Sequence, residues 1–144
     1  MEVNKTILVK NGRVIDGTAN DPLLNASILI ENGYFTRITT GDLPGPPAAV
    51  VIDATGKTVL PGLIDMHAHP LSGGVATLTE AIDSFDPATQ TRALKQMLYW
   101  GVTSVYNPVQ PLESGLHLRA QTAANSFPSP RLFISGPGFT APGG

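Results

Sequence analysis

Two histidines separated by one residue, His67 and His69, are the residues in this sequence whose types and spacing best suit chemistry. They follow an apolar run at residues 63–66, which predicts a buried β-strand. Side chains at positions i and i+2 of a strand point to the same side, so both imidazoles are expected to face one way. Two converging imidazoles supply half of the tetrahedral shell that Zn²⁺ takes in proteins. The pattern therefore predicts a divalent metal site, and the alternative is a histidine pair on an ordinary surface strand.

The neighbours of the pair bear on this choice. Asp65 has the same parity as the histidines, so it could orient a ligand from outside the metal shell or reach toward the metal itself. Residues 70–74, which are rich in Gly and Pro, are expected to form a mobile loop beside the pair. A buried strand followed by a loop is a more usual setting for a site than an exposed strand is.

The elements that must position the pair follow a strand and helix alternation. Residues 102–106 and 131–135 predict two further strands. Asp86 as N-cap, Pro87 at the first helical position and Gly101 as a stop predict one helix between the first two strands. A second helix is predicted with this apolar face: Leu112, Leu116, Ala120, Ala123 and Ala124. A β-α-β-α-β order implies a parallel sheet, either doubly wound or the start of a barrel, and both place active sites at the carboxyl ends of strands.

The N-terminal part has a different pattern, in which short β-like runs alternate with turn residues. Between residues 6 and 53 the turn pairs are Asn11-Gly12, Asp16-Gly17 and Asn32-Gly33. Prolines make residues 41–47 a loop, and residues 49–53 and 58–60 predict two further strands. The pattern predicts hairpins of a small β-domain.

Composition excludes several classes of protein. The 144 residues carry 9 basic and 11 acidic side chains, with a net charge of -2 and no cysteine. Thiolate metal sites and disulfides are therefore excluded, and no run of charge predicts a nucleic-acid or membrane partner. No apolar run approaches the roughly 18 residues of a membrane span, so a cytoplasmic protein is expected. A complete eight-stranded α/β barrel needs about 250 residues, which is more than this chain has.

Residues 56–69, Gly-Lys-Thr-Val-Leu-Pro-Gly-Leu-Ile-Asp-Met-His-Ala-His, resemble the first-strand motif of the amidohydrolase superfamily. Residues 11–17, 28–33, 101–105 and 130–138 also resemble segments of that family, as in its imidazolonepropionase-like and Xaa-Pro dipeptidase-like members. The resemblance implies an α/β protein with a small N-terminal β-sandwich-like domain at residues 1–58. Residues 59–144 would then be the start of a TIM (β/α)8 barrel, truncated after its first three strands.

The same resemblance implies a metal-dependent hydrolase that acts on C-N bonds of amide, cyclic amide or dipeptide-like substrates through a metal-activated water. His67 and His69 would be the first-strand metal ligands, with one or two Zn²⁺ ions as first choice and Fe, Mn or Ni left open. The further ligands and the catalytic Asp of the family come from later strands, so the 144-residue chain alone is expected to be an inactive fragment. A small-molecule substrate is expected, together with a homo-oligomer or completion by the remainder of the protein.

Some residues depart from the family pattern or stay outside it. His117 matches no family ligand and is expected on a helix surface. Tyr106-Asn107-Pro108 stands where many relatives carry an Arg-Asp pair. Tyr99 and Trp100 end a predicted helix and are expected to be core or interface anchors. An alternative from another class is a non-catalytic scaffold of the dihydropyrimidinase-related kind, against which the two retained histidines argue.

Overall fold

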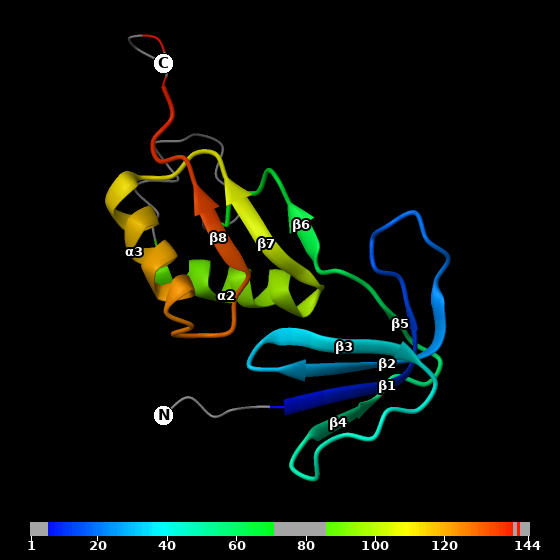
Figure 1. Cartoon of the computed structure of the whole chain (residues 1–144). Helices are drawn as coiled ribbons and strands as arrows, with labels where there is room; N and C mark the ends of the chain where they lie inside the picture. The colour runs from blue at the N-terminus through cyan, green and yellow to red at the C-terminus, as the bar shows by residue number, and fades with distance from the viewer. Residues whose placement is uncertain (1–5, 71–85, 140, 142–144) are drawn as a thin grey trace. The chain divides into compact units, whose positions relative to one another are not determined.

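The computed structural model describes residues 6–70, 86–139 and 141 of the chain (Figure 1). The backbone divides into two compact units, Met1–Pro61 and Gly62–Gly144. The first is called the β unit below, and the second the α/β unit.

The β unit is built on a five-stranded sheet with the order β3-β2-β1-β4, in which β5 also pairs with β1. Its strands are β1 (Thr6–Val14), β2 (Leu23–Glu31), β3 (Tyr34–Thr40), β4 (Val50–Asp53) and β5 (Thr58–Val59). Strands β1, β2 and β3 form antiparallel pairs, whereas β4 and β5 run parallel to β1. All of these strands bond into one sheet, so the predicted sandwich-like arrangement is not found in residues 6–61.

Two Asn-Gly pairs of the β unit have different structures. Asn32 and Gly33 connect β2 to β3 with φ of 54° and 81°, which is the left-handed backbone that a two-residue hairpin turn requires. That predicted hairpin is confirmed. The turn predicted at Asn11-Gly12 is wrong, because β1 continues through it and only its pairing register shifts there.

The physical reason is that Asn11, with a φ of 63°, makes a bulge in β1 instead of reversing the chain. Its Nδ2 donates to Asp53 Oδ1 at 2.9 Å, which ties the bulge to the end of β4. Hydrogen bonds from the Thr55 side chain, and then from Asn11, lower the pKa of Asp53.

The α/β unit contains β6 (Leu63–Asp65), α2 (Pro87–Tyr99), β7 (Val102–Asn107), α3 (Leu112–Ala123) and β8 (Arg131–Ile134). Its strands lie in the order β6-β7-β8 and are all parallel, which confirms the predicted adjacency and direction. Leu94 of α2 and Leu118 of α3 pack in one core cluster with Val105 of β7 and Leu132 of β8. Both helices therefore cover the same face of the sheet (Figure 1).

Helix α2 begins and ends where the sequence predicts. The Asp86 carboxylate accepts hydrogen bonds from the backbone N-H groups of Ala88 at 3.1 Å and Thr89 at 2.9 Å. Together with the Thr89 hydroxyl, which has the largest effect, these bonds lower the pKa of Asp86. Gly101 follows the helix with a φ of 90°, a conformation that stops it.

The predicted apolar face of α3 is wrong. The buried residues of α3 are Gly115, Leu118 and Thr122, whereas Leu116 is 40% exposed. A Cβ on Gly115 would lie 3.1 Å from Ile134 Cδ1, so this glycine lets the helix approach β8 closely. That approach turns Leu118, and not Leu116, into the core.

The predicted burial of residues 63–66 is also wrong, since Leu63 is 56% and Ile64 is 64% exposed. Within the described residues β6 pairs with β7 alone, so its second edge has no neighbouring strand. Tyr99 and Trp100 are exposed as well, which rules out a core role in this chain and leaves the interface role as a prediction.

Candidate metal site

The candidate site lies at the carboxyl end of the three-stranded sheet. Strand β6 ends at Asp65, and His67 and His69 follow it, while β7 ends at Asn107 and β8 at Ile134. Because the strands are parallel, their carboxyl ends share one edge of the sheet. The structure therefore brings residues from separate parts of the sequence to the edge where α/β proteins bind ligands.

The two histidine rings lie side by side. Their centroids are 5.1 Å apart and their planes make an angle of 84°. Both residues are exposed and lie just beyond the regular strand, which ends at Asp65. The short distance between the His67 and His69 rings agrees with the expectation that both rings lie on the same side of the backbone.

Backbone hydrogen bonds fix the segment that carries the histidines. Asp65 Oδ1 accepts a hydrogen bond from the His67 backbone N-H at 3.0 Å. The Ala68 backbone N-H donates to the carbonyl of Tyr106 at 3.1 Å, which ties the segment to β7. Asp65 thus contacts the backbone of a predicted ligand.

A chain of amide side chains leads from His69 into the core. His69 Nδ1 lies 3.1 Å from Asn107 Oδ1, and the Val109 backbone N-H donates to the same oxygen at 3.3 Å. Asn107 Nδ2 donates to Gln110 Oε1 at 2.6 Å. The side chains of Asn107 and Gln110 belong to residues that are 0% exposed. A buried amide pair therefore stands behind the exposed His69.

Sequence reasoning missed this role of Asn107 and Gln110. It noted Asn107 only as a departure from the family pattern. The signal that could have found it is position, since Asn107 ends the strand next to the one that the histidines follow. The interpretation of His117 as a helix-surface residue is confirmed, because it is exposed on α3.

The residues that the structure describes do not complete a metal shell. Among them there is no group of three or more His, Cys, Asp or Glu side chains that could hold a metal ion. The loop predicted at residues 70–74 lies outside the described residues except for Pro70, which is buried. Two histidine nitrogens are what this part of the chain can offer to a metal.

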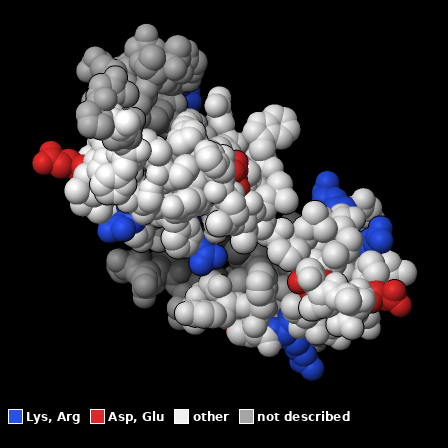
Figure 2. Space-filling view, turned by 90° about the horizontal axis from the view of Figure 1, so that it is seen from above, with Lys and Arg blue, Asp and Glu red and all other residues white. Residues whose placement is uncertain are grey.

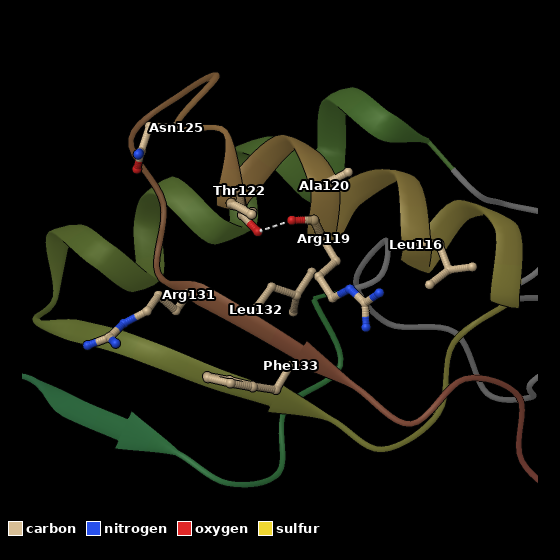
Figure 3. A pocket seen from close by; sticks show the side chains of 9 residues that line it. Leu116, Arg119, Ala120, Thr122, Asn125, Arg131, Leu132 and Phe133 are labelled. Carbon is tan, nitrogen blue, oxygen red and sulfur yellow. Dashed lines mark hydrogen bonds between the residues drawn. The ribbon is translucent and has the colours of Figure 1, made fainter. Parts of the chain in front are cut away.

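Two surface hollows differ in their chemistry. Asp65 and His69 line a hollow of about 410 Å³ together with residues of α2. A larger hollow of about 740 Å³ lies between α3 and β8 and is shown in Figure 3. No histidine or carboxylate lines it, and Arg119 and Arg131 point away from each other there. The smaller hollow is therefore the better candidate for chemistry.

The charged side chains form no continuous patch of one sign on the face shown in Figure 2. Basic and acidic groups of the described residues are scattered over it among neutral ones. Among the helices of the described residues, none combines the length and apolar character needed to cross a membrane.

Comparison with known proteins finds a family match over the part of the chain that carries the two histidines. The sequence model described as "Amidohydrolase family" matches residues 50–99, a stretch that includes His67 and His69. The chain is 32% identical over 111 residues to the enamidase of Eubacterium barkeri, which is 76% of this chain and 26% of that protein.

Solved structures of two enzymes share the fold of the chain. A structure of molinate hydrolase has a TM-score of 0.81 and 29% identity, over 93% of this chain and 30% of that one. An Xaa-Pro dipeptidase with bound methionine in its active site has a TM-score of 0.74 and 26% identity, over 97% of this chain and 35% of that one. The chain thus spans between 26% and 35% of the length of these three proteins. The family match over the histidine motif and the common fold show that this chain is similar to proteins of the amidohydrolase superfamily.

Proposed function

We propose that the protein carrying this chain is a metal-dependent hydrolase of C-N bonds, and that His67 and His69 are two of its metal ligands. The observation that carries this proposal is the pair of imidazole rings, 5.1 Å apart, directly after the first strand of a parallel sheet. Barrel hydrolases place their active sites at this end of the strands. We take β6, β7 and β8 as the first three strands of such a barrel.

The donor atoms suit a divalent metal. Imidazole nitrogens bind Zn²⁺, Fe and Ni well, and zinc is our first choice, with Mn also left open. In His69 the Nδ1 atom faces Asn107 Oδ1, so Nε2 is free to bind, and metal-bound histidines commonly have this arrangement. When bound, a metal of this kind supplies water activation and carbonyl polarisation at neutral pH. Its other ligands must come from outside the described residues.

The side chains around the pair have supporting roles in this proposal. Asp65 holds the backbone at His67, and Asn107 holds the ring of His69. Both contacts limit the directions in which the two imidazoles can point. A metal site with its ligands fixed in advance loses less conformational entropy on binding.

The substrate class rests on the relatives. One is named an enamidase, another a molinate hydrolase and a third an Xaa-Pro dipeptidase. We extend this to amide, cyclic amide or dipeptide-like small molecules. A cytoplasmic location and assembly as a homo-oligomer, or with the remainder of the protein, are parts of the same proposal.

The test uses the full-length protein and its variant with His67→Ala and His69→Ala together. Metal content after dialysis is measured by mass spectrometry, and hydrolysis is measured on a panel of amides, cyclic amides and dipeptides. We expect the double variant to lose its metal. Its activity should fall by more than the roughly 10–100-fold that is typical when a hydrogen-bond partner of a metal ligand is removed.

The matched control is His117→Ala, because His117 is an exposed histidine on α3. We expect it to keep the metal content and activity of the wild type. A double variant that retains stoichiometric metal and full activity would show that these histidines are not the ligands. A wild-type protein with neither metal nor activity on the panel would favour the scaffold alternative.

A further inference from the structure

We propose that Asn107 is a positioning residue that holds His69 in the tautomer with hydrogen on Nδ1, so that Nε2 is the nitrogen presented to a metal. The inference deepens the proposed metal site and rests on it for the role of Nε2. The tautomer itself is a property of the metal-free chain. It can therefore be tested separately.

The first step is the identity of the Asn107 atom that faces the ring. The Val109 backbone N-H lies 3.3 Å from Asn107 Oδ1, and a backbone N-H can only donate. The atom that receives it must be the amide oxygen and not the amide nitrogen. His69 Nδ1 lies 3.1 Å from that same oxygen, so a hydrogen bond between them needs the hydrogen on Nδ1.

The second step is the other end of the same amide. Asn107 Nδ2 donates to Gln110 Oε1 at 2.6 Å, and both residues are 0% exposed. Turning the Asn107 amide over would set its N-H groups against the Val109 N-H, which cannot accept, although Gln110 could turn its own amide to match. Buried groups opposed in this way lose their hydrogen bonds without gaining water. The orientation of Asn107 is thus fixed by the Val109 backbone N-H, and Gln110 supplies a matching acceptor.

The third step is where the acceptor is anchored. The Ser135 backbone N-H donates to the Asn107 carbonyl at 3.2 Å, and the Gln110 backbone N-H donates to the Gly136 carbonyl at 3.0 Å. Asn107 is therefore held by β7 and by the end of β8, while the exposed His69 follows β6. Asn107, which is held through β7 and the residues after β8, thus sets the orientation of the His69 ring, which follows β6.

The tautomer is measured by ¹⁵N NMR of the histidine rings in the metal-free chain. We expect His69 of the wild type to carry its hydrogen on Nδ1. Asn107→Leu keeps the branched shape of the side chain, in a somewhat larger volume, but has no acceptor, and we expect it to release the ring to a mixture of both tautomers. Asn107→Asp keeps an acceptor, and Gln110 can turn its amide to donate to it, so we expect this variant to keep the wild-type tautomer.

The matched control is Thr122→Val, since Thr122 is a buried polar residue of α3 whose hydroxyl donates to the Arg119 carbonyl at 2.9 Å. It should leave the His69 tautomer unchanged. A wild-type ring with its hydrogen on Nε2 overturns the proposal without any variant, so a poorly folded Asn107→Leu does not prevent a decision. An Asn107→Leu ring that stays in the Nδ1-H form overturns it too.

Titration with Zn²⁺ then links the tautomer to the metal. We expect zinc to shift Nε2 of His69 in the wild type, and affinity to fall by about 10–100-fold in Asn107→Leu with recovery in Asn107→Asp. Zinc on Nδ1 of His69 contradicts the inference. If zinc perturbs neither His67 nor His69 in the full-length protein, the proposed metal site fails, while the tautomer in the metal-free chain still decides the role of Asn107.

Discussion

The antiparallel strands β1, β2 and β3 of the β unit are shaped by local backbone conformation, whereas the parallel strands of the α/β unit are placed by packing. In the β unit, the left-handed pair Asn32-Gly33 joins β2 to β3, and the left-handed Asn11 sets the bulge in β1. In the α/β unit, Leu94 and Leu118 press two helices onto one face of the parallel sheet. Parallel strands cannot be joined by a two-residue turn, and in the α/β unit helices connect them instead.

The polar contacts of the two units differ in the same way. The bond from Asn11 to Asp53 is exposed and shapes a strand end, whereas the bond from Asn107 to Gln110 is buried. A buried hydrogen bond is costly to break because the separated groups find no water. The buried amide pair is therefore better suited than an exposed link to hold the exposed His69 in one orientation.

The largest expected effect tests the packing in the α/β unit. Leu118 is 3% exposed in the core cluster, and Leu116 on the same helix is 40% exposed. We expect Leu118→Ala to lower the free energy of unfolding by about 2–5 kcal/mol. Leu116→Ala should cost about 0.5 kcal/mol or less. Urea unfolding of the chain measures both, and similar costs for the two variants would contradict the observed face of α3.

A second expected effect concerns a glycine that is needed for space. A Cβ on Gly62 would lie 2.1 Å from Thr103 Oγ1 and 2.6 Å from Thr103 Cβ, and its φ is not left-handed. We expect Gly62→Ala to destabilise the chain by about 1–3 kcal/mol through overpacking between β6 and β7. Urea unfolding in a Thr103→Gly background should show a smaller cost. An unchanged cost there would mean that the Thr103 side chain is not the obstacle.

The smallest expected effect concerns a glycine that is needed for backbone conformation. Gly33 has a φ of 81°, and a Cβ placed on it would have nothing within 4 Å. We expect Gly33→Ala to cost about 1–2 kcal/mol, because L-residues are strained in this conformation. Gly33→Asn should cost less, since Asn tolerates it. Equal unfolding midpoints for Gly33→Ala and the wild type would weaken the comparison between the two sheets.

Much of the fold could be predicted because its signals are local. The cap at Asp86, the stop at Gly101 and the turn at Asn32-Gly33 each act within a few residues. The bulge at Asn11 could not be predicted, because an Asn-Gly pair suits a turn equally well and its bond to Asp53 joins positions far apart in the sequence. The face of α3 depended on how closely Gly115 lets the helix approach Ile134.

For the candidate site, the sequence by itself determined that His67 and His69 lie close to Asp65 just after a strand, because residues so near in the chain stay near in space. Only the tertiary structure decided that Asn107 faces the ring of His69, 38 positions away in the sequence, since parallel pairing brings the ends of β6 and β7 together. It also decided that β6 is exposed in this chain, because burial of a strand depends on which neighbours cover it. Residue type sets what a side chain can bind, and packing sets which atom it presents.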